Sequence, residues 1–129
     1  MSELRFKLAA GTNVGLIRGN NEDNFIVCPD LSKPEWIIPQ SDDYIELGAH
    51  GALLVVADGM GGMNAGEVAS AIAVETIQEM FTPDQIDAVR DDSKAIQKFM
   101  ADVVKVADLR ILQRSQDDSS TRGMGTTVV

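Results

Sequence analysis

The sequence predicts an α/β domain in which an antiparallel pair of helices lies on a β-sheet. Short runs of β-forming residues occur at 4–8, 24–28 and 51–58, and another begins at 124. Between the last two, apolar residues recur twice at helical spacing, from about 64 to 81 and from about 93 to 115. The stretch between these helical segments is short and polar, which favours antiparallel neighbours.

Length, composition and charge restrict the possible functions. The chain has 129 residues, enough for one domain, and 44% hydrophobic with 24% charged residues is ordinary for a soluble globular protein. Eleven basic and twenty acidic residues give a net charge of −9, which repels nucleic acid. The sequence has no signal-peptide pattern and no apolar run of membrane-spanning length. One cysteine, Cys28, excludes an internal disulfide and fits a reducing compartment. We therefore expect a cytoplasmic protein that binds neither nucleic acid nor membrane.

The first 28 residues are predicted to form two short strands around a polar turn. Leu4, Phe6 and Leu8 alternate with charged residues, as in a half-buried strand. A second run of β-forming residues, DNFIVC at 23–28, ends at Pro29. The sequence between them is rich in glycine, asparagine and aspartate, which tolerate turn geometry.

Residues 29–50 carry three prolines and many polar residues, and we interpret them as an insertion or long hairpin within the domain. Segments 36–38 and 44–47 are the expected arms of this hairpin. The next segment, GALLVVAD at 51–58, has a continuous apolar run. A continuous run is typical of a strand buried on both faces, so we expect such a strand here, with Asp58 at its tip.

Two helices are predicted in the second half of the chain. Asn64, followed three residues later by Glu67, predicts a capping pair at the start of the first helix, which ends before Thr82 and Pro83. The second helix, from about 93 to 115, has an apolar face that comprises Ile96, Phe99, Met100, Val103, Ala107 and Ile111. A loop at 116–123 and a final β-rich run complete the chain.

The segment ADGMGGMNAGE at 57–67 joins the predicted buried strand to the first helix. Its glycines could form a tight turn, a phosphate cradle or part of a metal site. A dinucleotide fingerprint fails because Asn64 stands where the last glycine belongs, and no Gly-Lys-Ser/Thr follows for a P-loop. The metal interpretation agrees better with the sequence, because the Asp58 carboxylate and the Gly59 carbonyl are hard oxygen ligands of the kind Mg²⁺ and Mn²⁺ prefer.

The segment RGNNEDN at 18–24 places one cation and two acids in a predicted turn. It could be a solvated turn with an incidental ion pair. Alternatively, Arg18 binds a phosphate in bidentate geometry, and Glu22 and Asp23 add oxygen ligands beside Asp58. Three carboxylates brought together without a cation would repel one another, so their convergence would favour a bound metal.

The two motifs together resemble a known family. RGNNED, then DGMGG after a strand, then GMGTT follow the order of the first three sequence blocks of the metal-dependent (PPM, type 2C) protein serine/threonine phosphatases. The resemblance extends from about Phe6 to Val129. It implies an α/β (α+β) fold, a two-sheet β-sandwich flanked by antiparallel helix pairs, of which this chain is the N-terminal portion. The family's aspartate in the first block is replaced here by Asn13.

The resemblance also implies a role for each candidate residue. Asp58 would bridge two Mg²⁺ or Mn²⁺ ions, and the Gly59 carbonyl and Glu22 would ligate one of them. Asp23 would hold metal-bound water or ligate directly, and Arg18 would bind the substrate phosphate. The implied reaction is hydrolysis of phosphoserine or phosphothreonine in proteins by a water activated by two metal ions. A phosphorylated protein would be the substrate, and a Ser/Thr kinase the counterpart in signalling.

Later aspartates of the family lie beyond Val129, so we expect residues 1–129 to be one domain truncated at its C-terminus and inactive alone. An alternative is a catalytically inactive phosphatase-like module that binds a phosphoprotein or a regulatory partner. Another is a metal- or nucleotide-binding α/β domain in which DGMGG is only a turn.

Overall fold

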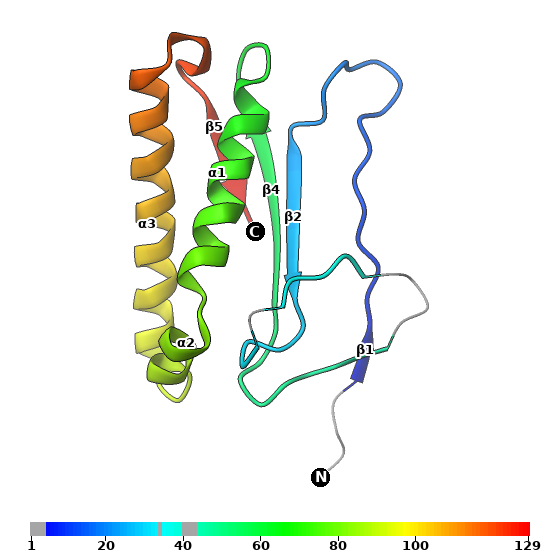
Figure 1. Cartoon of the computed structure of the whole chain (residues 1–129), viewed down its shortest axis with the longest axis vertical. Helices are drawn as coiled ribbons and strands as arrows, with labels where there is room; N and C mark the ends of the chain where they lie inside the picture. Colours follow the sequence, from blue (N-terminus) through cyan, green and yellow to red (C-terminus); the bar gives the residue numbers. More distant parts are fainter. Residues whose placement is uncertain (1–4, 34, 40–43) are drawn as a thin grey trace.

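A computed structural model describes residues 5–33, 35–39 and 44–129. These residues form two antiparallel sheets and three α-helices (Figure 1). The larger sheet has the strand order β2-β4-β5, with β2 at Asp23–Cys28, β4 at Leu53–Met60 and β5 at Gly125–Val128. The smaller sheet pairs β1 at Arg5–Lys7 with β3 at Tyr44–Glu46. The predicted combination of two sheets and an antiparallel helix pair is confirmed.

Helices α1 at Ala65–Met80 and α3 at Ser93–Asp117 run antiparallel on one side of the larger sheet (Figure 1). Small side chains let α1 approach the sheet closely: Ala69 and Ala73 are fully buried. The main core between helices and sheet contains Ile26, Val55, Ala57, Val74, Ile77 and Val103. The apolar residues that predicted strands and helices therefore meet in one layer between them.

Strand β4 alternates between buried and exposed residues, so the prediction of a strand buried on both faces is wrong. Val55 and Ala57 face α1 and are buried, whereas Leu54 and Val56 are 45% and 56% exposed. The helices of the described residues cover one face of the sheet, and apolar side chains also occupy the other. The strand also continues beyond Asp58 to Met60.

The interval 29–50 folds differently from the predicted hairpin. Strand β3 pairs with β1, in the register Arg5 with Glu46, and not with segment 36–38. Ile37 instead forms an isolated bridge with Val27 of β2. Both arms are thus paired with strands from the start of the chain, which the local sequence pattern could not reveal. The prediction of an insertion is not tested by this pairing, and residues 34 and 40–43, like Leu4, lie outside the described residues.

A short helix, α2 at Pro83–Val89, replaces the predicted polar connection between the two long helices. Thr82 caps it, because its Oγ1 accepts a hydrogen bond of 3.3 Å from the Gln85 amide, and Pro83 occupies the first turn. Asp92 caps α3 in the same way and accepts from the amides of Lys94 and Ala95. In the described part of the chain, no helix combines the length and apolarity needed to cross a bilayer.

Candidate metal and phosphate site

Asp23 and Asp58 lie directly opposite each other on paired strands. The register of β2 and β4 aligns Asp23 with Asp58, so both side chains project from the same face of the sheet. Both residues are exposed, and that face is opposite α1, because the neighbouring residues Ala57 and Gly59 are buried. Directly opposed like charges destabilise a sheet unless a cation lies between them. Pairing of β2 with β4 therefore creates a position where a cation would relieve repulsion.

Glu22 and Gly59 form a second pair at the end of the same strands. The Gly59 amide donates a hydrogen bond of 3.1 Å to the Glu22 carbonyl. The Glu22 side chain is largely buried, 15% exposed, and lies against Gly66 in the first turn of α1. A Cβ atom at Gly66 would lie 2.9 Å from both carboxylate oxygens of Glu22. The positive end of the helix dipole favours a carboxylate in this position.

Gly59 also makes the closest contact between strand and helix. A Cβ atom at Gly59 would lie 1.9 Å from the Gly66 carbonyl oxygen, which no side chain can accept. The glycine that the sequence suggested as a carbonyl ligand is thus required by packing as well. Gly66 escaped the sequence analysis. Glycine lowers the stability of a helix, so its presence in the first turn of the predicted helix indicated that another part of the chain lies close to it.

Arg18 lies in the loop between β1 and β2, and its side chain is 77% exposed. Its Nη1 is 3.9 Å from Oε2 of Glu22, the limit of an ion pair. One contact lies within the loop, where Asn21 Nδ2 donates to Thr12 Oγ1 over 2.7 Å, and one joins it to another segment, where Asn20 Nδ2 donates to Oδ1 of Asn64. The guanidinium is thus accessible from solvent, with Glu22 at the limit of ion-pair distance.

The contact with Asn20 explains a wrong prediction about Asn64. Asn64 occupies the N-cap position of α1, but its side chain makes no capping hydrogen bond. The predicted capping pair with Glu67 is therefore absent among the described residues. The Asn64 oxygen accepts from the RGNNED loop instead, a contact over 44 residues of sequence. The two sequence motifs are linked directly, which their separation in sequence could not show.

The donor chemistry at this end of the sheet suits a hard divalent cation. Asp23 and Asp58 supply carboxylates on one face, and Glu22 lies beside the Gly59 backbone. Among the described residues, however, no three acidic, histidine or cysteine side chains converge on a single point. The structure therefore brings the predicted residues together as two pairs, and Asp23 with Asp58 is the pair whose arrangement fits a shared cation.

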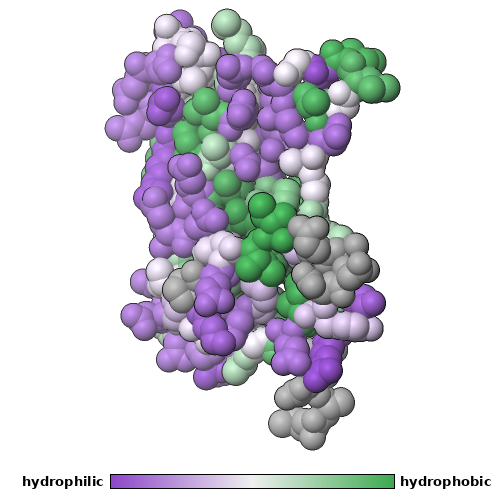
Figure 2. All heavy atoms as spheres, turned by 45° about the vertical axis from the view of Figure 1, so that its right-hand side comes forward, coloured by the Kyte–Doolittle hydropathy of each residue, from purple (hydrophilic) through white to green (hydrophobic). Residues whose placement is uncertain are grey.

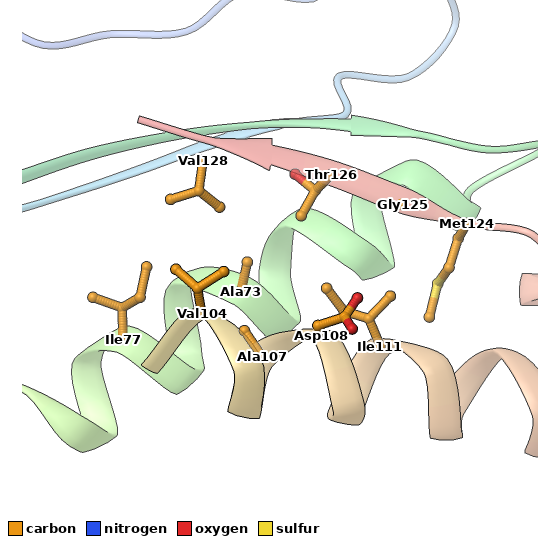
Figure 3. A pocket seen from close by; sticks show the side chains of 10 residues that line it. All are labelled: Ala73, Ile77, Val104, Ala107, Asp108, Ile111, Met124, Gly125, Thr126 and Val128. Carbon is orange, nitrogen blue, oxygen red and sulfur yellow. The ribbon is translucent and has the colours of Figure 1, made fainter. Parts of the chain in front are cut away.

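The cavity between helices and sheet is distinct from these pairs. It has a volume of about 180 Å³ and lies between α1, α3 and β5 (Figure 3). Its lining is largely apolar, and Asp108 and Thr126 are its polar side chains. None of the five predicted site residues lines it. The polar end of β2 and β4 suits a metal and a phosphate better than this largely apolar cavity.

Comparison with known proteins identifies the family of this chain. Residues 38–129, more than half of the chain, match the family model described as Protein phosphatase 2C. The chain belongs to the protein phosphatase 2C family. The resemblance inferred from RGNNED, DGMGG and GMGTT is confirmed. The family match includes Asp58 and Gly59 but begins after Arg18, Glu22 and Asp23.

Bacterial relatives extend this match. Protein phosphatase PhpP of Streptococcus pneumoniae serotype 2 is 36% identical over 76 residues, 59% of this chain and 29% of that protein. Serine/threonine phosphatase stp of Listeria innocua is 27% identical over 118 residues, 92% of this chain and 39% of that protein. The Listeria monocytogenes protein of the same name is 28% identical over an equal length. A match over 92% of the chain necessarily includes residues 18–59, and therefore both the RGNNED and the DGMGG segments. The chain spans well under half the length of these relatives.

Proposed function

We propose that this chain supplies phosphate- and metal-binding residues of a metal-dependent hydrolase acting on phosphoserine and phosphothreonine in proteins. The observation that carries the proposal is the alignment of Asp23 with Asp58 on one face of the sheet, next to the loop of Arg18. Membership of the phosphatase 2C family and the names of the bacterial relatives support it.

Each residue has a role in this proposal. Asp23 and Asp58 would hold Mg²⁺ or Mn²⁺ from one side, with Glu22 and the Gly59 carbonyl as further ligands. Two such ions, when bound, supply positive charge to the phosphoryl oxygens and make water more acidic. The Arg18 guanidinium donates two parallel hydrogen bonds to the phosphate and fixes its orientation. The Asp23 carboxylate accepts a hydrogen bond from the attacking water and directs it toward phosphorus.

The biological setting belongs to the same proposal. The substrate class is a protein phosphorylated on serine or threonine, so a Ser/Thr kinase is the expected counterpart in a signalling pathway. We place the protein in the cytoplasm, since its single cysteine, Cys28, fits a reducing compartment. The strongly acidic net charge argues against nucleic acid as a partner.

The decisive experiment compares Asp58→Asn with a matched control, Asp91→Asn, which removes the same charge from an exposed turn before α3. Mn²⁺ binding is measured by calorimetry and phosphopeptide hydrolysis by phosphate release. We expect Asp58→Asn to weaken Mn²⁺ binding at least tenfold and Asp91→Asn to leave it unchanged. Equal Mn²⁺ affinity in both variants would show that Asp58 is not a ligand.

The prediction that residues 1–129 alone are inactive stays a prediction, and the same assay tests it. Hydrolysis is measured for this chain and for a version extended to the length of its relatives. We expect turnover in the extended protein only. Robust turnover by the 129 residues would contradict this expectation, and phosphopeptide binding without hydrolysis in both would favour an inactive phosphatase-like module.

A further inference from the structure

Two large apolar side chains project from the loop that carries Arg18. Leu16 and Ile17 are fully exposed, at 105% and 98% of their reference accessibility. Figure 2 shows hydrophobic residues projecting at the end of the molecule where this loop lies. Scattered exposed leucines are ordinary, but two consecutive, fully exposed apolar residues beside a candidate phosphate ligand are not.

Polar contacts lie on both sides of the exposed pair in this loop. The Gly15 amide donates to Asn13 Oδ1 over 2.7 Å, before the exposed pair. After the pair, Asn21 donates to Thr12 and closes the loop. The remaining residues of 11–22 are mainly glycine and asparagine, and Val14, 40% exposed, is the other apolar residue in this segment. The loop is built as a closed turn that displays an apolar tip.

A further exposed apolar side chain lies at the same end of the sheet. Met63 is 86% exposed and adopts φ of 55°, a conformation uncommon for a residue with a side chain. It precedes Asn64, whose contact with Asn20 joins the two loops. Figure 1 shows both loops at the same end of β2 and β4. The loop that carries Arg18 and the loop that carries Met63 therefore both expose apolar side chains.

Charge singles out Arg18 as the anchor for an anionic ligand. Every predicted site residue lies in segments 8–32 or 51–89. Arg18 is the only lysine or arginine in these two segments. A phosphate drawn to this guanidinium brings the adjacent residues of its peptide over the loop tip. Because Leu16 and Ile17 directly precede Arg18, a peptide residue next to the phosphorylated one is placed near these two apolar side chains.

We propose that Leu16 and Ile17 select phosphopeptides with a bulky apolar residue next to the phosphorylated serine or threonine. This inference rests on the proposed function, because it takes Arg18 as the phosphate ligand. The apolar residue covers Leu16 and Ile17, and Met63 borders it from the DGMGG loop. The selectivity comes from apolar surface removed from water when the peptide binds.

The test uses two labelled phosphothreonine peptides that differ only in the flanking residues, leucine in one and serine in the other. Their affinities are measured by fluorescence anisotropy with Mn²⁺ present. We expect the chain to bind the leucine peptide about tenfold more tightly, which corresponds to about 1.4 kcal/mol. The double substitution Leu16→Ser and Ile17→Ser should abolish this preference. A matched control, Leu109→Ser with Leu112→Ser, removes two exposed leucines from α3 and should retain it.

The outcomes separate this inference from the proposed function. If Arg18→Ala weakens binding of both peptides while the Leu16 and Ile17 variant keeps the preference, the phosphate site stands and the selectivity is overturned. If neither peptide binds the version extended to the length of the relatives, both proposals are overturned, and if that version binds both peptides equally, the selectivity alone is overturned. A third outcome is that the unsubstituted chain binds phosphatidylcholine vesicles, the Leu16 and Ile17 variant does not, and the unsubstituted chain binds both peptides equally. The loop tip then contacts lipid, and the proposal of peptide selection is wrong.

Discussion

Gly59 shows how one residue serves packing and a candidate site together. Its backbone touches Glu22 on one side and the first turn of α1 on the other, where a Cβ atom would lie 1.9 Å from the Gly66 carbonyl oxygen. The sequence motif DGMGG suggested a ligand carbonyl. The structure adds a steric reason for glycine, which is independent of any metal.

Substitution of Gly59 by alanine should therefore destabilise the fold itself. We expect a loss of about 1–3 kcal/mol, because the added methyl group meets backbone atoms that can move only with the helix. Gly62→Ala is the matched control in the same motif, since a Cβ there meets nothing within 4 Å. Urea unfolding of both variants measures the difference. Equal midpoints would contradict the close contact.

Asp30 gives a prediction about acid. The Ser32 hydroxyl and amide donate to its carboxylate over 2.5 and 2.9 Å and lower the pKa of Asp30 below its ordinary value. Because this pKa is lower in the folded state, the stabilisation is present above the ordinary pKa of 3.8 and is lost as pH falls through the folded value. Folding stability should thus decrease on acidification through this range.

Ser32→Ala should reduce that dependence, because it removes the hydroxyl donor and leaves the amide. The urea midpoint is measured at about pH 6 and about pH 3. We expect a smaller difference between the two values in Ser32→Ala than in the unsubstituted chain. Ser119→Ala, an exposed serine of the 3₁₀ turn Ser119–Thr121, serves as control and should keep the full difference. A steeper dependence in Ser32→Ala would refute the role of its hydroxyl.

At the scale of elements, long periodic segments were the most predictable. The helix predicted from about 93 to 115 is α3 at Ser93–Asp117, and the stop at Thr82 and Pro83 is the real end of the helical run of α1. Helix α2 was missed because its seven residues bury only Ile86, too few for a period to appear. The pairing of β1 with β3 was missed because partner choice depends on the whole chain.

In strand β4 the burial of the side chains differs from what the apolar sequence pattern predicted. Its apolar run is continuous, but only alternate residues are buried. Val55→Ala should cost about 2 kcal/mol, because Val55 is in the main core. Val56→Ala, one residue later and 56% exposed, should stay within about 0.5 kcal/mol. Chemical denaturation of the two variants tests the one-sided burial, and equal losses would show that the outer face is covered in solution.

At the scale of the whole molecule, the residue types of the site were predictable and their arrangement was not. The motifs identified Arg18, Glu22, Asp23, Asp58 and Gly59 as candidates, because cations, carboxylates and glycines suit phosphate and metal. Which of them meet depends on strand register, and the register pairs Asp23 with Asp58. The link between Asn20 and Asn64 likewise arises only after folding brings the loops together.

Net charge also acts on the whole molecule. The chain carries −9, and its ion pairs, such as Lys98 with Asp102 and Arg110 with Glu79, involve largely exposed groups that stabilise little. Repulsion among the excess carboxylates should therefore dominate the effect of salt. Raising NaCl from about 0.01 M to about 0.1 M shortens the screening length from about 30 Å to about 10 Å. We expect the urea midpoint to rise over this range.

A variant with fewer charges tests whether repulsion is the cause. Asp91→Asn with Asp108→Asn removes two exposed carboxylates, so the net charge changes from −9 to −7. This variant should be more stable than the unsubstituted chain at low salt and should gain less from added NaCl. A midpoint that falls with salt would instead show that attractive ion pairs outweigh the repulsion. Because the long-range field depends on the sum of charges, Asp91 and Asp108 need not touch each other for the effect to appear.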